Sequence, residues 1–478
     1  MASPHRADKS EEFASAPTFG LIVKYSIPTI IGMLVNALYV LIDRIFVGHL
    51  AGIGELGMAG INIAMPVTTI VFAVAMFAGA GAGANISLSL GRGEREKAEQ
   101  YIGNGLMMGA VIAFALSVLF IMFRTPVLQL FGASGEAVKA LPYAEQYLTV
   151  MLIGTTINTV GFCLSRFVLA QGFTTVSMTS QILGVAVNIV LAPLFLFVFH
   201  WGVTGSAWAT VVAQTCAMLF TLIYFLRQRM PLSIRLKHIK PDWGALGRIA
   251  SIGISPGSLQ LAMAFVQIML NNSLAPYGVV ATSALSVVNA VSAVLLMPIF
   301  GINQGAQPIM GFNYGARHYH RVRRLLLQSI AIAVCLMTAF WALLMLGAEQ
   351  VVRLFGAQNE GLMQLGPQAI RMYLAALPLV GFQVISANYF QSVGKAGYSF
   401  VLTQSRQVLI LLPMVLILPH FFGMNGVFMS GAIADGASAV LTGIFLMIEL
   451  KKLDAQAKEE LHAAASAAQE RSLKEAGD

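Results

Sequence analysis

Long apolar runs, separated by short charged or Gly/Pro-rich breaks, dominate this chain. A helix that crosses a membrane needs about 20 apolar residues, and twelve runs are long enough to supply one each. These runs cover approximately residues 20–48, 56–84, 100–123, 141–169, 176–198, 201–225, 247–274, 280–312, 320–346, 364–392, 397–419 and 423–449. The pattern predicts an all-α polytopic membrane protein with twelve transmembrane helices.

Composition excludes a water-soluble globule. Only 10% of the 478 residues are Asp, Glu, Lys or Arg, and 57% are hydrophobic, whereas soluble proteins contain about 25% charged residues. The net charge of +8 does not indicate nucleic-acid binding, because the basic residues lie in short loops between apolar runs rather than on one domain. We therefore expect membrane lipid as the surrounding medium and no nucleic-acid partner.

The basic loops predict how the helices are oriented. An even number of spans puts both tails on one side, and the loops of that side hold fourteen Lys and Arg. The other side holds three, Arg124, Lys139 and Arg353, or four if Arg44 is counted. Cationic loops stay in the cytoplasm, which predicts a multi-pass protein of the cytoplasmic (inner) membrane with both termini inside. Residues 1–18 have no apolar core, so we expect no cleavable signal peptide.

The two halves of the chain repeat one another. Residues 127–136 recur as 351–360, and Gly81 and Gly91 recur as Gly305 and Gly315 at the same spacing of 224. Two lobes of equal orientation are typical of transporters that bind their substrate between the lobes. The boundaries that we expect are a tail over 1–18, an N-lobe over 19–225, a basic linker over 226–246, a C-lobe over 247–450 and a tail over 451–478.

Polar residues within the spans mark a candidate site in the N-lobe. Asn36, Tyr39 and Asp43 are spaced three and four apart, so they share one face of the first helix. At 1.5 Å per residue, Asn188 and Thr210 lie roughly 14 Å from the outer ends of their helices, close to the depth of Asp43. A carboxylate in an apolar span is costly, so we predict a shared pocket for a coupling ion or substrate. The alternative is an Asp43 at the outer interface, screened by the arginine that follows it.

The second candidate site is in the C-lobe. Asp435 and Arg406 lie at nearly equal distances from the outer ends of the twelfth and eleventh helices, which predicts a buried ion pair. Such a pair is either structural, with both charges neutralised, or a second protonation site or substrate contact. Arg166, near the cytoplasmic end of the fourth helix, is expected to reach the membrane interface.

Other features of the spans carry less chemistry. The glycines around Gln304 and Gln307 in the eighth helix predict close helix packing. The three cysteines, Cys163, Cys216 and Cys335, lie in separate apolar runs, and the histidines near the outer face stand singly. We therefore expect no metal site, no cofactor and no catalytic constellation.

At this point the sequence resembles the multidrug and toxic compound extrusion (MATE) family of transporters over about residues 18–450. The motifs that carry the resemblance are the first-helix sequence over 43–48, the eighth-helix stretch over 304–316 and the twelfth-helix stretch over 431–435. The resemblance implies two six-helix lobes around a V-shaped central cavity, and proton- or sodium-driven export of amphipathic, often cationic organic compounds. It also suggests that Asp43 and its neighbours bind the coupling ion. We expect a monomer.

The resemblance bears on the coupling ion as well. Sodium-using members of the family commonly carry an acidic residue four positions after the asparagine of the fifth helix, whereas here Asn188 is followed by Ala192. A proton needs only one carboxyl group, so we expect proton coupling through Asp43, with sodium as the alternative. A flippase for lipid-linked saccharides or other polar lipids remains a rival, although it should line its cavity with several cations. A membrane-embedded enzyme is disfavoured because no catalytic cluster lies at one depth.

Overall fold

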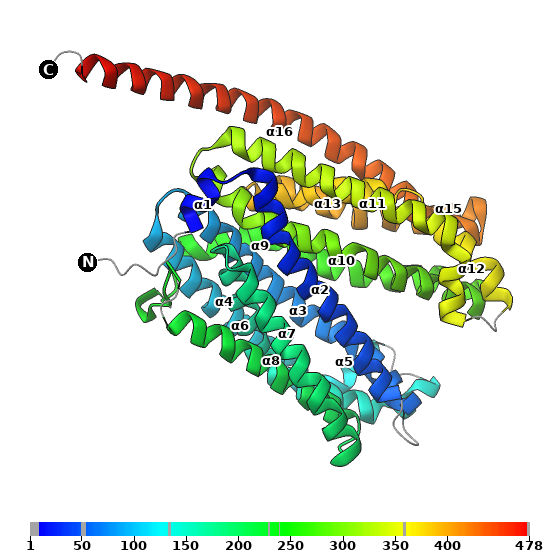
Figure 1. The fold of residues 1–478 in the computed structure, drawn as a ribbon. Coiled ribbons are helices and arrows are strands. Elements are labelled where there is room, and N and C mark those ends of the chain that lie inside the picture. The colour runs from blue at the N-terminus through cyan, green and yellow to red at the C-terminus, as the bar shows by residue number, and fades with distance from the viewer. Residues whose placement is uncertain are drawn as a thin grey trace.

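The computed structural model describes residues 9–48, 54–131, 135–227, 230–238, 240–356 and 360–475, and helices form most of this part (Figure 1). The first half contains α1 (Lys9–Ser15), α2 (Thr18–Gly48), α3 (Gly54–Gly91), α4 (Arg95–Met122), α5 (Arg124–Leu130), η1 (Gly135–Ala140), α6 (Leu141–Ala170), α7 (Thr174–Pro193), η2 (Leu194–Val198) and α8 (Val203–Leu226). The second half contains η3 (Leu236–His238), α9 (Trp243–Leu274), η4 (Ala275–Tyr277), α10 (Val279–Gly315), α11 (Tyr319–Gly356), α12 (Glu360–Tyr373), α13 (Leu377–Ser392), α14 (Ala396–Gln404), η5 (Ser405–Leu411), α15 (Leu412–Phe422) and α16 (Met424–Glu475).

The predicted membrane spans are confirmed. Within the described ranges, eleven helices are long and apolar enough to cross a membrane, and the bent pair α12 and α13 makes a twelfth. The run predicted as one span over 364–392 corresponds to this pair, and its two helices meet at 45°. Pro378 follows Leu377 at the start of α13; its ring disfavours a helical residue before it and it has no N–H to continue the helix.

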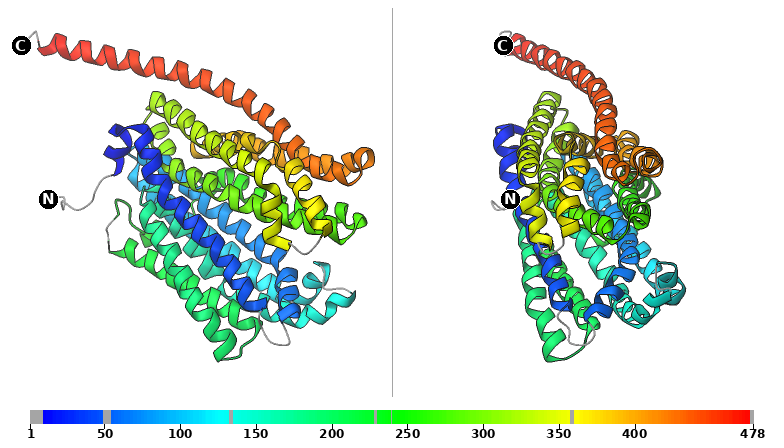
Figure 2. Two further views of the ribbon diagram at one scale, coloured as in Figure 1. Left: turned by 45° about the vertical axis from the view of Figure 1, so that its right-hand side comes forward. Right: turned by 90° about the vertical axis from the view of Figure 1, so that its right-hand side faces the viewer.

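The bundle has two lobes, as predicted. Helices α2, α3, α4, α6, α7 and α8 form one lobe, and helices from α9 to α16 form the other (Figure 1). The start of α1 and the end of α16 lie at the same end of the bundle, which we call the tail end (Figure 2). On the outside, α11 exposes large apolar side chains such as Leu343 and Leu346, which are 68% and 83% exposed. These faces suit contact with lipid.

The contacts between the lobes follow the internal repeat. A Cβ on Gly91 would lie 2.0 Å from the carbonyl oxygen of Phe312, and a Cβ on Gly315 would lie 2.2 Å from that of Leu88. Shifting the residue numbers by 224 turns one contact into the other, because Gly91 corresponds to Gly315 and Leu88 to Phe312. The same holds for Gly81, which meets the carbonyl of Ile249 in α9, and for Gly305, which meets Tyr25 and Ser26 in α2. The predicted duplication is therefore also a pseudo-two-fold packing arrangement.

All of these close approaches lie toward the tail end. They involve the second halves of α3 and α10, which run toward it, and the first halves of α2 and α9, which start from it. The predicted close packing of the eighth span is confirmed at Gly301, Gly305 and Gly311, where an added Cβ would lie 2.5 to 3.0 Å from Ile30, Ser26 and Ser87. The lobes thus meet through glycine at the tail end.

One glycine of this contact gives a stability prediction. A Cβ on Gly253 would lie 2.0 Å from the carbonyl oxygen of Phe77, so Gly253→Ala should lower the free energy of unfolding by about 1–3 kcal/mol, as overpacking does. Gly247 lies in the same helix with nothing within 4 Å of its Cβ position. Gly247→Ala should therefore be neutral or stabilising. Denaturation of both purified variants in SDS compares them, and equal stability would contradict the close packing.

The short helix α1 packs against both lobes at the tail end. Phe13 is 2% exposed and packs edge to face on Tyr25 and on Phe312. Its ring also fills the space beside Gly172, which has φ +85°, at the end of α6. The carbonyl of Phe13 accepts a hydrogen bond of 3.0 Å from Arg321 of α11. A single apolar side chain thus contacts the N-lobe and the C-lobe together.

Electrostatic contacts hold α1 in the same place. Glu12 pairs with Lys24 and Lys9 and accepts a hydrogen bond from the Tyr25 hydroxyl at 3.2 Å. Burial raises the pKa of Glu12, but the hydrogen bonds and charges of Lys24 and Lys9 together outweigh it, so this pKa lies below its usual value. The carboxylate therefore stays charged at neutral pH.

The last helix, α16, continues without a break from its membrane span to Glu475, over 52 residues. The residues expected as a C-terminal tail over 451–478 extend the same helix as far as Glu475. An ion pair of 2.8 Å between Arg323 and Asp454, and a hydrogen bond of 3.0 Å from the Tyr319 backbone N–H to Glu460, attach it to α11. Beyond these contacts it projects away from the bundle (Figure 2).

Candidate functional site

Three of the predicted N-lobe residues lie together. The Tyr39 hydroxyl of α2 is 3.0 Å from the Thr210 hydroxyl of α8, and the Asn188 carboxamide of α7 donates a hydrogen bond of 3.2 Å to the same Thr210 oxygen. Asn188 and Thr210 are 2% and 6% exposed. Buried polar groups need partners, and here one hydroxyl joins the three helices. We call Tyr39, Asn188 and Thr210 the N-lobe cluster.

The other two residues predicted for this site are Asp43 and Asn36. Asp43 follows Tyr39 by four residues in α2, one turn along the same helix face, but its side chain lies outside the described residues. Asn36 precedes Tyr39 by three residues, and its side chain is exposed. The structure therefore brings Tyr39, Asn188 and Thr210 together and leaves Asn36 at the edge of the cluster.

Ala192, the position at which an acidic residue would favour sodium as the coupling ion, lies in apolar surroundings. Ala192, one turn after Asn188 in α7, is fully buried and belongs to an apolar cluster with Val47, Leu196 and Val203. A carboxylate at that position would enter an apolar environment rather than the hydrogen-bonded one around Thr210. The N-lobe cluster thus offers neutral oxygens and one amide.

The predicted C-lobe pair is present. Arg406 donates a hydrogen bond from Nε to Asp435, which is 2% exposed. Arg406 lies in η5, a π-helical turn of the span that runs from Ala396 to Phe422, and such turns often accompany functional sites. Tyr373, at the end of α12 beside the bend, packs against Gly431 one turn before Asp435. The pair therefore lies next to the broken span.

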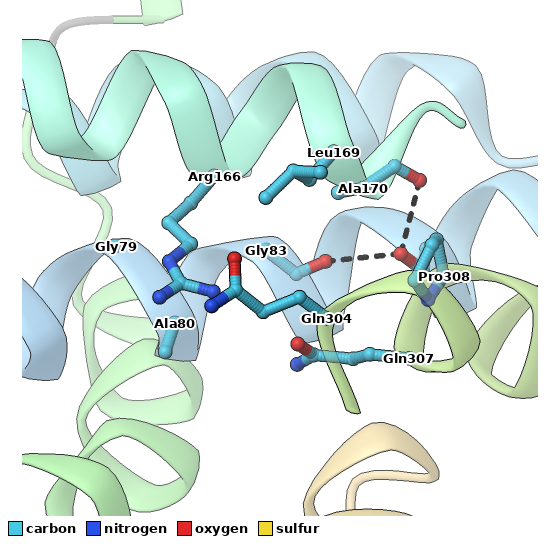
Figure 3. Close-up of a pocket in the computed structure, with 10 residues that line it drawn as sticks. Gly79, Ala80, Gly83, Arg166, Leu169, Ala170, Gln304, Gln307 and Pro308 are labelled. Atoms are coloured by element: carbon cyan, nitrogen blue, oxygen red, sulfur yellow. Dashed lines mark hydrogen bonds between the residues drawn. The ribbon is translucent and has the colours of Figure 1, made fainter. Parts of the chain in front are cut away.

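A pocket between the lobes contains a residue that sequence reasoning misjudged. It is lined by α3, α6 and α10, through Gly79, Ala80, Gly83, Ser87, Arg166, Leu169, Ala170, Gln304, Gln307 and Pro308. Arg166 was expected to extend to the membrane interface, but its side chain points into this pocket, toward Gln304 (Figure 3). Its depth could be read from the sequence, whereas the face of α6 that meets α10 could not.

The pocket is shaped by small residues and by one hydroxyl. The Ser87 hydroxyl bonds to the carbonyls of Gly83, at 3.2 Å, and Ala170, at 3.0 Å, and so ties α3 to α6 (Figure 3). Gly79 and Gly83 leave room beside the Arg166 side chain. Backbone contacts therefore fix the walls, while Arg166, Gln304 and Gln307 supply the long polar side chains that line the pocket.

Comparisons with known proteins agree with this architecture. The multidrug export protein MepA of Staphylococcus haemolyticus (strain JCSC1435) is 25% identical over 439 residues, which cover 92% of this chain and 95% of the relative. The protein of the same name from Staphylococcus aureus (strain N315) is 25% identical over 451 residues, covering 94% and 97%. A solved structure, described as the outward-facing conformation of a multidrug resistance MATE family transporter, has a TM-score of 0.87 at 24% identity and covers 95% of this chain and 99% of that one.

The model of one family covers most of the two lobes. The MatE model matches residues 28–194 and 258–417, once in each half of the internal repeat. This double match, the two lobes and the twelve spans have a single explanation. The chain belongs to the MatE family and is a membrane transporter, not an enzyme.

Proposed function

We propose that this protein is an ion-coupled antiporter that exports amphipathic organic compounds, cationic ones among them, by alternating access. The observation that carries the proposal is the N-lobe cluster, which gathers three polar side chains inside an apolar lobe, one helical turn from Asp43. The multidrug export names of the two relatives support the substrate class. No cofactor is needed for such exchange.

We further propose that the tail end faces the cytoplasm of a cell whose cytoplasmic membrane contains the protein. The excess of Lys and Arg in the loops of that side supports this orientation. The lobes meet at the tail end, so this arrangement would be closed to the cytoplasm and would correspond to the state that releases substrate outside. The expected V-shaped cavity would then open outward.

The coupling ion in this proposal is a proton, carried by Asp43. Sodium is best held by several oxygens, and Ala192, buried in an apolar cluster, adds no side-chain oxygen to those of the N-lobe cluster. Exchange of one proton on one carboxyl requires no such cage. Inward movement of one charge across 100 mV provides about 2.3 kcal/mol, and at about 1.4 kcal/mol per tenfold this supports a substrate gradient of somewhat under a hundredfold.

Efflux of a fluorescent cation from reconstituted vesicles tests the coupling ion. With a proton gradient and no sodium, we expect efflux; with a sodium gradient at fixed symmetric pH, we expect none. Robust transport in the second condition, lost when choline replaces sodium, would overturn the proton assignment. A flippase for polar lipids is less favoured, because Arg166 is the single cation among the residues that line the described inter-lobe pocket.

A further inference from the structure

Arg166 is a charged group that forms no ion pair with the residues the structure describes. Three other cations associated with the spans pair with a carboxylate: Arg406 with Asp435, Lys395 with Glu449, and Arg323 with Asp454. Arg321, Arg248 and Arg371 instead donate to neutral oxygens of the chain. Among the residues that the structure describes, no carboxylate lies within ion-pair distance of Arg166. An unpaired guanidinium between membrane helices is costly. A negative group from outside the chain would remove that cost.

The guanidinium is held so that its donors stay available. It lies over the Phe162 ring, 4.7 Å from the centroid, and its one described hydrogen bond is a 3.9 Å contact with the sulfur of Met76. Arginine carries five N–H donors in a planar fork. In the described part of the chain no oxygen accepts from them, and the side chain faces the pocket (Figure 3).

The opposite wall supplies neutral donors. Gln304 and Gln307 lie three apart on one face of α10 and line the same pocket. Neither carboxamide is hydrogen-bonded to another described residue. The positions equivalent to them in the repeat, 224 residues earlier, are Ala80 and Gly83. The two lobes therefore differ at this pocket: α10 of the C-lobe lines it with two carboxamides, whereas the equivalent positions of α3 in the N-lobe carry none.

We propose that this pocket binds the carboxylate of an organic substrate, so that zwitterionic and anionic amphipathic compounds belong to the transported class. A planar guanidinium fork matches a carboxylate in two parallel hydrogen bonds, and the amides from the other lobe can donate to the same oxygens. One guanidinium suits one carboxylate; a diphosphate would call for several cations. The inference rests on the proposed export of organic compounds and deepens it.

A matched pair of dyes tests the proposal on the full-length protein in lipid nanodiscs. The probes are a rhodamine free acid and its methyl ester, which differ by one carboxylate, and the readout is fluorescence anisotropy. Arg166→Gln should weaken binding of the acid by about tenfold to a hundredfold, the range for a lost charge-assisted hydrogen bond, and should leave the ester unchanged. Arg166→Lys, which keeps the charge and loses the fork, should fall between Arg166→Gln and the wild type.

Arg227→Gln is the control for charge alone, because Arg227 is exposed at the end of α8; it should affect neither dye. Equal losses for acid and ester in Arg166→Gln, or no loss for the acid, would overturn the proposal. If Arg166→Gln does not fold, Gln307→Leu from the other wall should weaken the acid selectively. In the wild type, benzoate should displace the rhodamine acid. The proposal is overturned if the wild type does not bind the acid, or if benzoate does not displace it. Since these measurements need no ion gradient, they fail or succeed independently of proton coupling.

Discussion

Asp43→Asn is expected to abolish proton-driven efflux while leaving the protein folded. The amide keeps the shape of the side chain and removes the one carboxyl group that follows the N-lobe cluster on the α2 face. Without it, no proton can be exchanged for substrate, so efflux in reconstituted vesicles should fall to the level of vesicles without protein. Binding of substrate and thermal unfolding, measured on the same sample, should remain near those of the wild type.

The matched control is Asp454→Asn, which removes the same charge from a half-exposed carboxylate paired with Arg323 at the tail end. We expect it to transport at the wild-type rate. Retention of proton-driven efflux by Asp43→Asn would show that another group carries the proton. The C-lobe carboxylate Asp435 would then be the next candidate.

Asp435→Asn is expected to act on stability. The substitution strands Arg406 among buried residues, and breaking a buried ion pair from one side costs about 3–5 kcal/mol. SDS titration of the purified protein should show a loss of this size. Adding Arg406→Met to Asp435→Asn removes the stranded charge, so the double variant should recover much of the stability.

The same variant separates the two roles considered for the pair. If the pair is structural, the double variant should also recover transport. If Asp435→Asn keeps wild-type stability and loses transport, Asp435 is a protonation site or a substrate contact instead. The position of Arg406 in a π-helical turn beside the bend of α12 and α13 makes this second outcome worth measuring.

Much of the fold was predictable because lipid imposes length and composition on each span. The repeat of 224 residues also relates the glycine contacts to one another, since both copies pack against each other across the same pseudo-two-fold axis. The run over 364–392 did not show where its bend lies, although Pro378 marks the place. The short helix α1 had no such signal, because Phe13 is apolar in isolation and gains its role only from contacts with Tyr25 and Phe312.

The sequence predicted which polar side chains lie close together where depth in the helix was sufficient, but not where the rotation of a helix mattered. Counting residues from helix ends placed Asn188 and Thr210 at one level, and likewise Arg406 and Asp435, and each pair is in contact. Arg166 was placed at the correct end of α6, but its side chain faces α10 rather than the lipid interface. Which face of a helix meets the other lobe depends on packing between distant segments, and no local pattern records it.

The continuous course of α16 has a mechanical consequence. Because the helix passes from the C-lobe into its projecting segment without a break, any tilt of that lobe is transmitted along it as in a lever. The residues after Glu460, which accepts a hydrogen bond from α11, extend roughly 22 Å at 1.5 Å per residue. A fluorophore attached near Glu475 would therefore move farther than any point within the bundle, and its displacement relative to the membrane surface would report the opening and closing of a single transporter.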